Sequence, residues 1–108
     1  MQTQRCLWPL AGLLACTVSA ENYPAQRAEA ECALYEQCDL LAAFEDSYAS
    51  CLSALLAQES AWVGSADCDY SGAAARQCVR DLEEATCDAL RDAALEDLSP
   101  CVMVCSGS

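Results

Sequence analysis

The chain contains no lysine and no histidine, and its only basic residues are Arg5, Arg27, Arg76, Arg80 and Arg91. Nucleophilic hydrolysis lacks a base to activate a serine, so no catalytic residues are assigned. Nucleic-acid binding is excluded on charge, because there is no basic patch. Seventeen acidic residues give a net charge of −12 over 108 residues. Such a surface repels nucleic acid and anionic lipid headgroups, and it keeps an exported domain soluble.

Motifs for metal or redox chemistry are also missing. Zinc sites and redox-active cysteines typically have C-x₂-C spacing. No two cysteines here have it, and the closest pair is Cys101 and Cys105. Residues 67–72 match the first half of an EF-hand loop, but Cys78 stands where the loop needs a bidentate Glu. We interpret this segment as a turn in which Asp69 or Ser71 caps the next helix. We therefore expect no metal and no cofactor.

The first residues have the layout of an export signal. Arg5 precedes a run of apolar residues, 6–15, which is interrupted only by Pro9 and Gly12. This run is too short for a bilayer, whose hydrocarbon core requires about 20 apolar residues. It ends in Leu13-Leu14-Ala15-Cys16, which resembles the lipobox of bacterial lipoproteins. Residues 1–15 are therefore predicted to be a lipoprotein signal peptide, and Cys16 the lipidated first residue of the mature chain.

Two other interpretations of this segment stay open. Val18-Ser19-Ala20 is an acceptable site for ordinary signal peptidase, which would release a soluble chain beginning at Glu21. Alternatively, Cys16 is one more disulfide cysteine. The lipobox interpretation places the protein in the cell envelope, attached to a membrane through lipid. By resemblance to Gram-negative lipoproteins, Thr17 after the cysteine, in place of Asp, favours the outer membrane.

The composition after the signal favours a domain held by disulfides. All seventeen acids lie there and Arg5 does not, so the mature charge is −13. Alanine occurs 21 times in the chain and buries little apolar area. Small exported domains with thin cores are typically stabilised by disulfides. Eight cysteines follow Cys16, an even number, and we expect four disulfides among Cys32, Cys38, Cys51, Cys68, Cys78, Cys87, Cys101 and Cys105.

Apolar periodicity predicts an all-α domain of three to four helices behind the signal peptide. The expected helices are 25–43, 48–63, 73–86 and 87–98, the last either continuing the third or bending at Thr86. Asp46 or Ser47 is expected to cap the second helix, and Ser99-Pro100 to end the fourth. The charged residues between the apolar positions, among them Glu31 and Arg76, are placed on the outer faces. The predicted organisation is a flexible tether, 16–24, a cysteine-rich helical domain, 25–105, and a tail, 106–108.

One disulfide follows from a hairpin argument. If the first two helices turn near Phe44 and Glu45, Cys38 and Cys51 lie equally far from the turn on facing stripes. We therefore predict the pair Cys38–Cys51. Trp62 and Val63, near the end of the second helix, form either a small exposed contact patch or part of the core.

The whole pattern resembles a known group of proteins. The lipobox, the eight spaced cysteines, Cys68-Asp69-Tyr70 before an Ala-rich helix, Thr86-Cys87-Asp88 and Pro100-Cys101 are similar to small cysteine-rich lipoproteins of GC-rich Gram-negative bacteria. The resemblance implies a location and no activity, and Cys16 is the only functional residue it supplies. We expect a non-enzymatic envelope component or binding module of unknown ligand, with a protein or cationic partner favoured by its charge. The alternative is a soluble secreted effector or inhibitor.

Overall fold

The computed structural model describes residues 17–92 and 99–106, and this part of the chain is mainly helical. Its elements are α2 (Tyr23–Gln37), the 3₁₀ helix η1 (Leu41–Phe44), α3 (Tyr48–Val63), α4 (Gly72–Glu84), α5 (Cys87–Asp92) and α6 (Ser99–Val102). Within these residues no strand forms, and Asp69 and Ser106 make an isolated bridge. The predicted small, disulfide-stapled all-α domain is confirmed.

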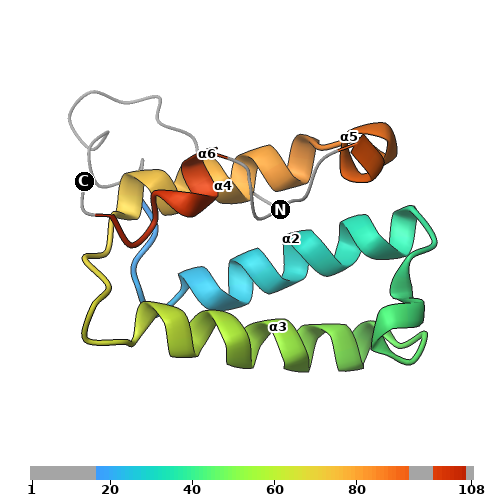
Figure 1. Ribbon diagram of the computed structural model, residues 1–108, viewed down its shortest axis with the longest axis horizontal. Helices are drawn as coiled ribbons and strands as arrows, with labels where there is room; N and C mark the ends of the chain where they lie inside the picture. The colour runs from blue at the N-terminus through green and yellow to red at the C-terminus, as the bar shows by residue number, and fades with distance from the viewer. Residues whose placement is uncertain (1–16, 93–98, 107–108) are drawn as a thin grey trace.

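Helix α2 lies at the centre of the arrangement. Figure 1 shows α3 along one side of α2 and α4 along the other, and α2 packs against both. The short α6 lies on α4. Ala75, Cys78, Val79 and Leu82 form the inner stripe of α4, and all four are buried. Tyr23, the first residue of α2, is fully buried in the same core.

The first helix is shorter than its apolar pattern predicts. It ends at Gln37, and Asp39 follows with a φ of 60°, which is incompatible with a right-handed helix. Apolar residues 41–44 then form η1 instead of a further α-helical turn. Glu45 and Asp46 also have positive φ values, of 61° and 58°, and turn the chain into α3.

The second and third predicted helices are close to those observed. Helix α3 spans the predicted 48–63, and the Ser47 hydroxyl accepts a hydrogen bond of 3.1 Å from the Ser50 amide. The Ser71 hydroxyl caps α4 in the same way through the Ala74 amide, also at 3.1 Å. Residues 67–72 therefore supply a helix cap, as interpreted from the sequence.

The chain bends after α4, which was one of the two predicted alternatives. Ala85 is extended, with a ψ of 152°, and separates α4 from α5. The Thr86 hydroxyl then accepts the Ala89 amide at 3.1 Å, as a cap of α5. The rest of the predicted fourth helix, 93–98, lies outside the described residues. Ser99 and Pro100 open α6, where proline is tolerated because the first turn needs no amide donor.

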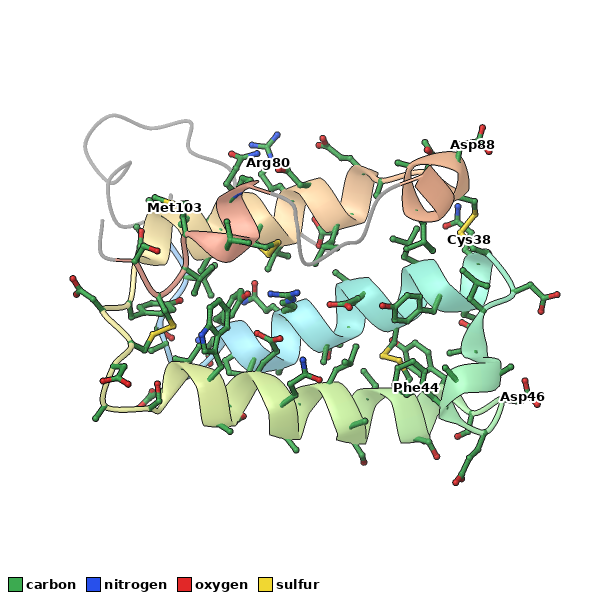
Figure 2. All side chains as sticks on the ribbon, in the orientation of Figure 1. Cys38, Phe44, Asp46, Arg80, Asp88 and Met103 are labelled. Atoms are coloured by element: carbon green, nitrogen blue, oxygen red, sulfur yellow. A yellow bond between two sulfur atoms is a disulfide. The ribbon has the colours of Figure 1, made fainter. Side chains whose placement is uncertain are left out.

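The predicted Cys38–Cys51 disulfide is wrong. Cys51 of α3 bonds to Cys32 instead, with 5.9 Å between their Cα atoms, and Cys38 bonds to Cys87 of α5 with 5.5 Å. The predicted pair requires the first helix to continue to residue 43. Because α2 ends at Gln37, Cys38 lies beyond the helix pair, and Figure 2 shows it joined to α5 by a disulfide.

The other two disulfides attach the C-terminal segment to the rest of the domain. Cys68 bonds to Cys105, and Cys78 of α4 bonds to Cys101 of α6. Val104, which lies between Cys101 and Cys105 in the chain, is fully buried, and its carbonyl accepts a hydrogen bond of 2.7 Å from the Ser71 amide. All eight predicted cysteines are therefore in disulfides. Ser106, placed in the predicted tail, makes the bridge to Asp69.

The prediction of a flexible tether is wrong from residue 18 onwards. Val18 is 4 % exposed, its amide donates to the Gly72 carbonyl at 3.2 Å, and its carbonyl accepts the Tyr70 hydroxyl. The Ser19 carbonyl accepts the Tyr23 amide at 2.9 Å, at the start of α2. Apolar periodicity does not predict this packing, because the packing depends on one buried side chain and on backbone hydrogen bonds. The domain therefore begins before the predicted residue 25.

Candidate functional site

Charged side chains lie inside the helical domain, where the sequence analysis did not place them. Arg27, Glu31 and Glu59 are buried, and so is Arg76. The predicted outward positions of Glu31 and Arg76 are therefore wrong. Burying a charge is costly unless it is paired, so the contacts among Arg27, Glu31 and Glu59 decide what this region can do.

Glu31 is well paired through both carboxylate oxygens. Arg27 Nε donates to Glu31 Oε1 at 3.0 Å, one helical turn away on α2. The Tyr35 hydroxyl donates to Glu31 Oε2 at 2.9 Å. The charge of Glu31 is thus compensated within its own helix.

Glu59 is paired much more weakly. It comes from α3 and is 4 % exposed. Its Oε1 atom lies 3.5 Å from Arg27 Nη1, at the limit of a hydrogen bond. The same nitrogen donates to the Tyr23 hydroxyl at 3.0 Å. Arg27 therefore binds Glu31 and Tyr23 closely and leaves Glu59 with a long contact.

The pKa values of this cluster follow from burial and from the shared guanidinium. Burial raises the pKa of Glu59, Arg27 opposes that rise, and the neighbouring Glu31 adds to it. Burial also raises the pKa of Tyr23 to about 12, so its hydroxyl is neutral at physiological pH. For Arg27, burial alone would lower the pKa, but Tyr23 and the two carboxylates outweigh burial and raise it. Arg27 stays charged, and one carboxylate remains in excess.

A cavity of about 270 Å³ lies directly beside this cluster. Residues from α2, α3 and α6 surround it: Arg27, Gln58, Glu59, Trp62, Cys101 and Val102. Glu59 and Trp62 are three residues apart, which places them on one face of α3. Trp62 is half-buried and packs against the core. It is therefore partly a core residue and partly an exposed one, as each of the two interpretations from the sequence proposed. The cavity combines a buried carboxylate with an aromatic wall.

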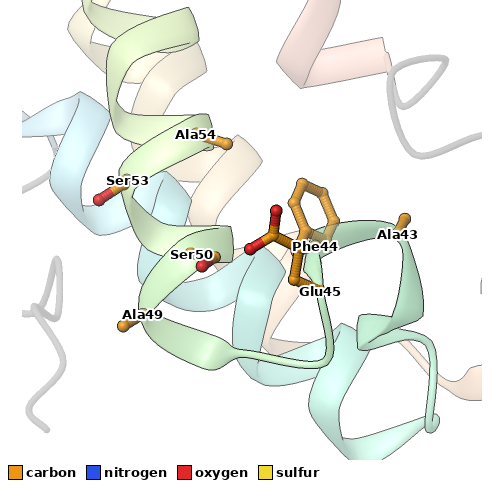
Figure 3. Close-up of a pocket in the computed structure, with 7 residues that line it drawn as sticks. All are labelled: Ala43, Phe44, Glu45, Ala49, Ser50, Ser53 and Ala54. Atoms are coloured by element: carbon orange, nitrogen blue, oxygen red, sulfur yellow. The ribbon is translucent and has the colours of Figure 1, made fainter.

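A second hollow, of about 580 Å³, lies at the opposite end of α3 (Figure 3). It is lined by Ala43, Phe44, Glu45, Ala49, Ser50, Ser53 and Ala54, none of which is buried. The Phe44 ring stacks on Tyr35, with 5.7 Å between ring centroids. Its one charged residue, Glu45, is exposed, so this hollow lacks the desolvated polar groups that orient a bound ligand.

No family model, curated protein or solved structure matches this chain. Any function must therefore be inferred from the chain itself. None of the helices within 17–92 and 99–106 has the length and apolar character needed to cross a bilayer. Across the same residues, no three acidic or cysteine side chains gather in a way that would hold a metal ion.

The predicted site residues are distributed unevenly with respect to the cavity. Cys16 lies outside the described residues. Of the eight disulfide cysteines, Cys101 lines the cavity, and its disulfide to Cys78 holds α6 in place beside it. Within the part described, no cysteine is free.

The sequence carried a signal for the buried cluster. Tyr23, Arg27, Glu31 and Tyr35 recur at intervals of four residues, which places them along one face of α2. Glu31 was placed on the outer face because the neighbouring apolar stripe gave α2 a core side. Glu59, from another helix, has no such signal, because only the packing of α3 against α2 brings it to Arg27.

Proposed function

We propose that this protein is an exported, lipid-anchored, non-enzymatic binding module of the cell envelope, whose mature chain begins at Cys16. The observation that carries the proposal is the burial of Val18 in the domain core. The four disulfides are consistent with this proposal, because they persist in oxidising compartments such as the periplasm.

Val18 and Ser19 distinguish the two signal-cleavage sites. Cleavage before Cys16 retains Val18 in the core and Ser19 at the start of α2. Cleavage after Ala20 would remove both residues, and it would leave the Gly72 carbonyl and the Tyr70 hydroxyl without their contacts to Val18. This packing favours the lipobox over the secreted alternative.

The same packing supports a position of the domain close to the membrane. One residue, Thr17, separates the proposed lipidated cysteine from buried Val18. Two residues of extended chain span at most about 7 Å. We therefore propose that the domain rests at the membrane surface, and the resemblance noted above favours the outer membrane. A long flexible tether would instead let it reach away from that surface.

The cavity beside Glu59 supports a binding role. Its polar groups come from α2 and α3, and the Cys78–Cys101 disulfide attaches α6 to α4 beside it. A largely preformed cavity with a few buried polar groups is the usual form of a small-ligand site. No residue that lines it is a histidine, lysine or free cysteine, so the lining lacks the usual nucleophiles of covalent catalysis.

Variants at the two cleavage sites test the proposal. The full chain is expressed in a Gram-negative host as wild type, as Cys16→Ser and as Ala20→Glu, which removes the small residue that ordinary signal peptidase needs. We expect wild type and Ala20→Glu in the membrane fraction, and loss of Cys16→Ser from it. Unchanged fractionation of Cys16→Ser, together with accumulation of the Ala20→Glu precursor, would establish the soluble secreted effector instead.

A further inference from the structure

We propose that the cavity between α2, α3 and α6 binds the ammonium group of a small aliphatic amine, with the Glu59 carboxylate and the Trp62 indole as its recognition groups. This inference rests on the proposed binding function and names its ligand class. It does not depend on the lipid anchor.

The charge balance of the cluster favours a cation. Arg27 carries one positive charge, and Glu31 and Glu59 together bring two negative charges. Glu31 is satisfied through both oxygens, by Arg27 and by Tyr35. Glu59 is nearly fully buried and has a 3.5 Å contact to a nitrogen that already binds Tyr23 at 3.0 Å. A buried carboxylate with so weak a partner is stabilised by a second cation beside it.

Trp62 adds the second recognition element. It lies one turn after Glu59 on α3, and both residues line the cavity. An ammonium group is attracted to the face of an indole, and the attraction grows when the pair is removed from water. Val102 and the disulfide-bonded Cys101 form an apolar wall that suits a short alkyl chain. The cavity volume of about 270 Å³ is suited to a ligand of a few heavy atoms.

Arg27 also lines the cavity, and an anionic ligand is the obvious competitor. Arg27 Nε is bound to Glu31 at 3.0 Å, and Nη1 to Tyr23. A ligand carboxylate approaching Arg27 would meet Glu59 at the same cavity wall. The chain also carries a net charge of −12, and its field concentrates cations and repels anions. These charges favour an amine over a carboxylate.

Trp62 provides the reporter for a direct test. The only other tryptophan, Trp8, precedes both candidate cleavage sites, so the mature protein contains Trp62 alone. The mature protein is purified in a non-ionic detergent and titrated at constant ionic strength with butylammonium, 1-butanol and butyrate, which have similar shapes and different charges. We expect a saturable change in Trp62 fluorescence with butylammonium and a response at least about tenfold weaker with the other two.

A pair of variants tests the role of the carboxylate. Glu59→Gln keeps the shape of the side chain and removes its charge, and we expect it to weaken butylammonium binding about tenfold or more. Glu83→Gln removes the same charge from an exposed position of α4 and is expected to bind like wild type. Circular dichroism establishes that both variants are folded. If Glu59→Gln does not fold, the comparison of the three ligands on wild type still decides.

Several results would overturn the inference: equal binding of butanol and butylammonium, preference for butyrate, absence of saturable binding, or unchanged affinity of folded Glu59→Gln. None of these concerns membrane attachment. Fractionation of Cys16→Ser measures attachment separately, so a failure of amine binding and a failure of the lipid anchor are distinguishable.

Discussion

Val18 and Gly72 are joined by a backbone hydrogen bond of 3.2 Å, which fixes the N-terminal segment on the first residue of α4. The approach is close because residue 72 has no side chain. A Cβ atom there would lie 3.0 Å from the Thr17 Cβ and 3.1 Å from the Val18 carbonyl oxygen. The segment next to the proposed lipidation site is thus built into the fold.

Replacing Val18 measures how much this segment contributes to stability. We expect Val18→Ala to lower the free energy of unfolding by about 1–3 kcal/mol, because it removes buried methyl groups and leaves a cavity. Val102→Ala is the matched control, because Val102 is 47 % exposed and its truncation is expected to cost under about 0.5 kcal/mol. Urea unfolding followed by circular dichroism, with the disulfides intact, measures both. Equal effects of the two substitutions would contradict the packing of Val18.

The disulfide pairing is testable by peptide mapping without reduction. A protease that cuts after glutamate separates Cys32, in 32–36, from Cys38, in 37–45. We expect 32–36 joined to 46–59, which contains Cys51, and 37–45 joined to 85–96, which contains Cys87. A peptide joining 37–45 to 46–59 would restore the Cys38–Cys51 pairing and contradict the observed end of α2.

The burial of Glu59 predicts a pH-dependent stability. Burial raises the pKa of Glu59 in the folded state. The contribution of this group to stability is therefore complete at a pH below its unfolded pKa, and it is lost as the pH rises through the folded value. Arg27, which lowers the pKa of Glu59, and Glu31, which raises it, are the charged groups that act on this carboxyl, and burial outweighs the effect of Arg27.

Glu59→Gln removes this titration. We expect the melting temperature of Glu59→Gln minus that of wild type to be more positive at pH 7 than at pH 4. Glu83→Gln, at an exposed position, supplies the comparison for loss of a surface charge. Thermal unfolding of the three proteins at both pH values provides the measurement. A relative shift downward would show that the pairing with Arg27 outweighs the cost of burial.

Local patterns predicted most of the helical fold. The spacing of apolar residues in 48–63 predicted α3. Ser47 and Ser71 were each one of two candidate caps, because a short oxygen-bearing side chain before a periodic run satisfies free helix amides. The eight cysteines indicated four disulfides by their even number alone.

Features that depend on packing between distant segments were missed. Asp39 follows the end of α2 in a left-handed backbone conformation that the neighbouring sequence does not reveal. Because the helix ends early, Cys38 lies away from Cys51 and bonds to Cys87. Val18 is buried because Gly72 lies across from it. Of the candidate site, the four-residue spacing along α2 was visible in the sequence, whereas Glu59 reaches Arg27 only through the contact between α2 and α3.

The most direct test of the account is the intact mass of the native protein from the membrane and soluble fractions, before and after reduction. The account predicts a membrane-bound species that begins at acylated Cys16 and gains about 8 Da on reduction of four disulfides. A soluble, unacylated species beginning at Glu21 would contradict it, because the mature domain would then lack the buried Val18 on which the account depends.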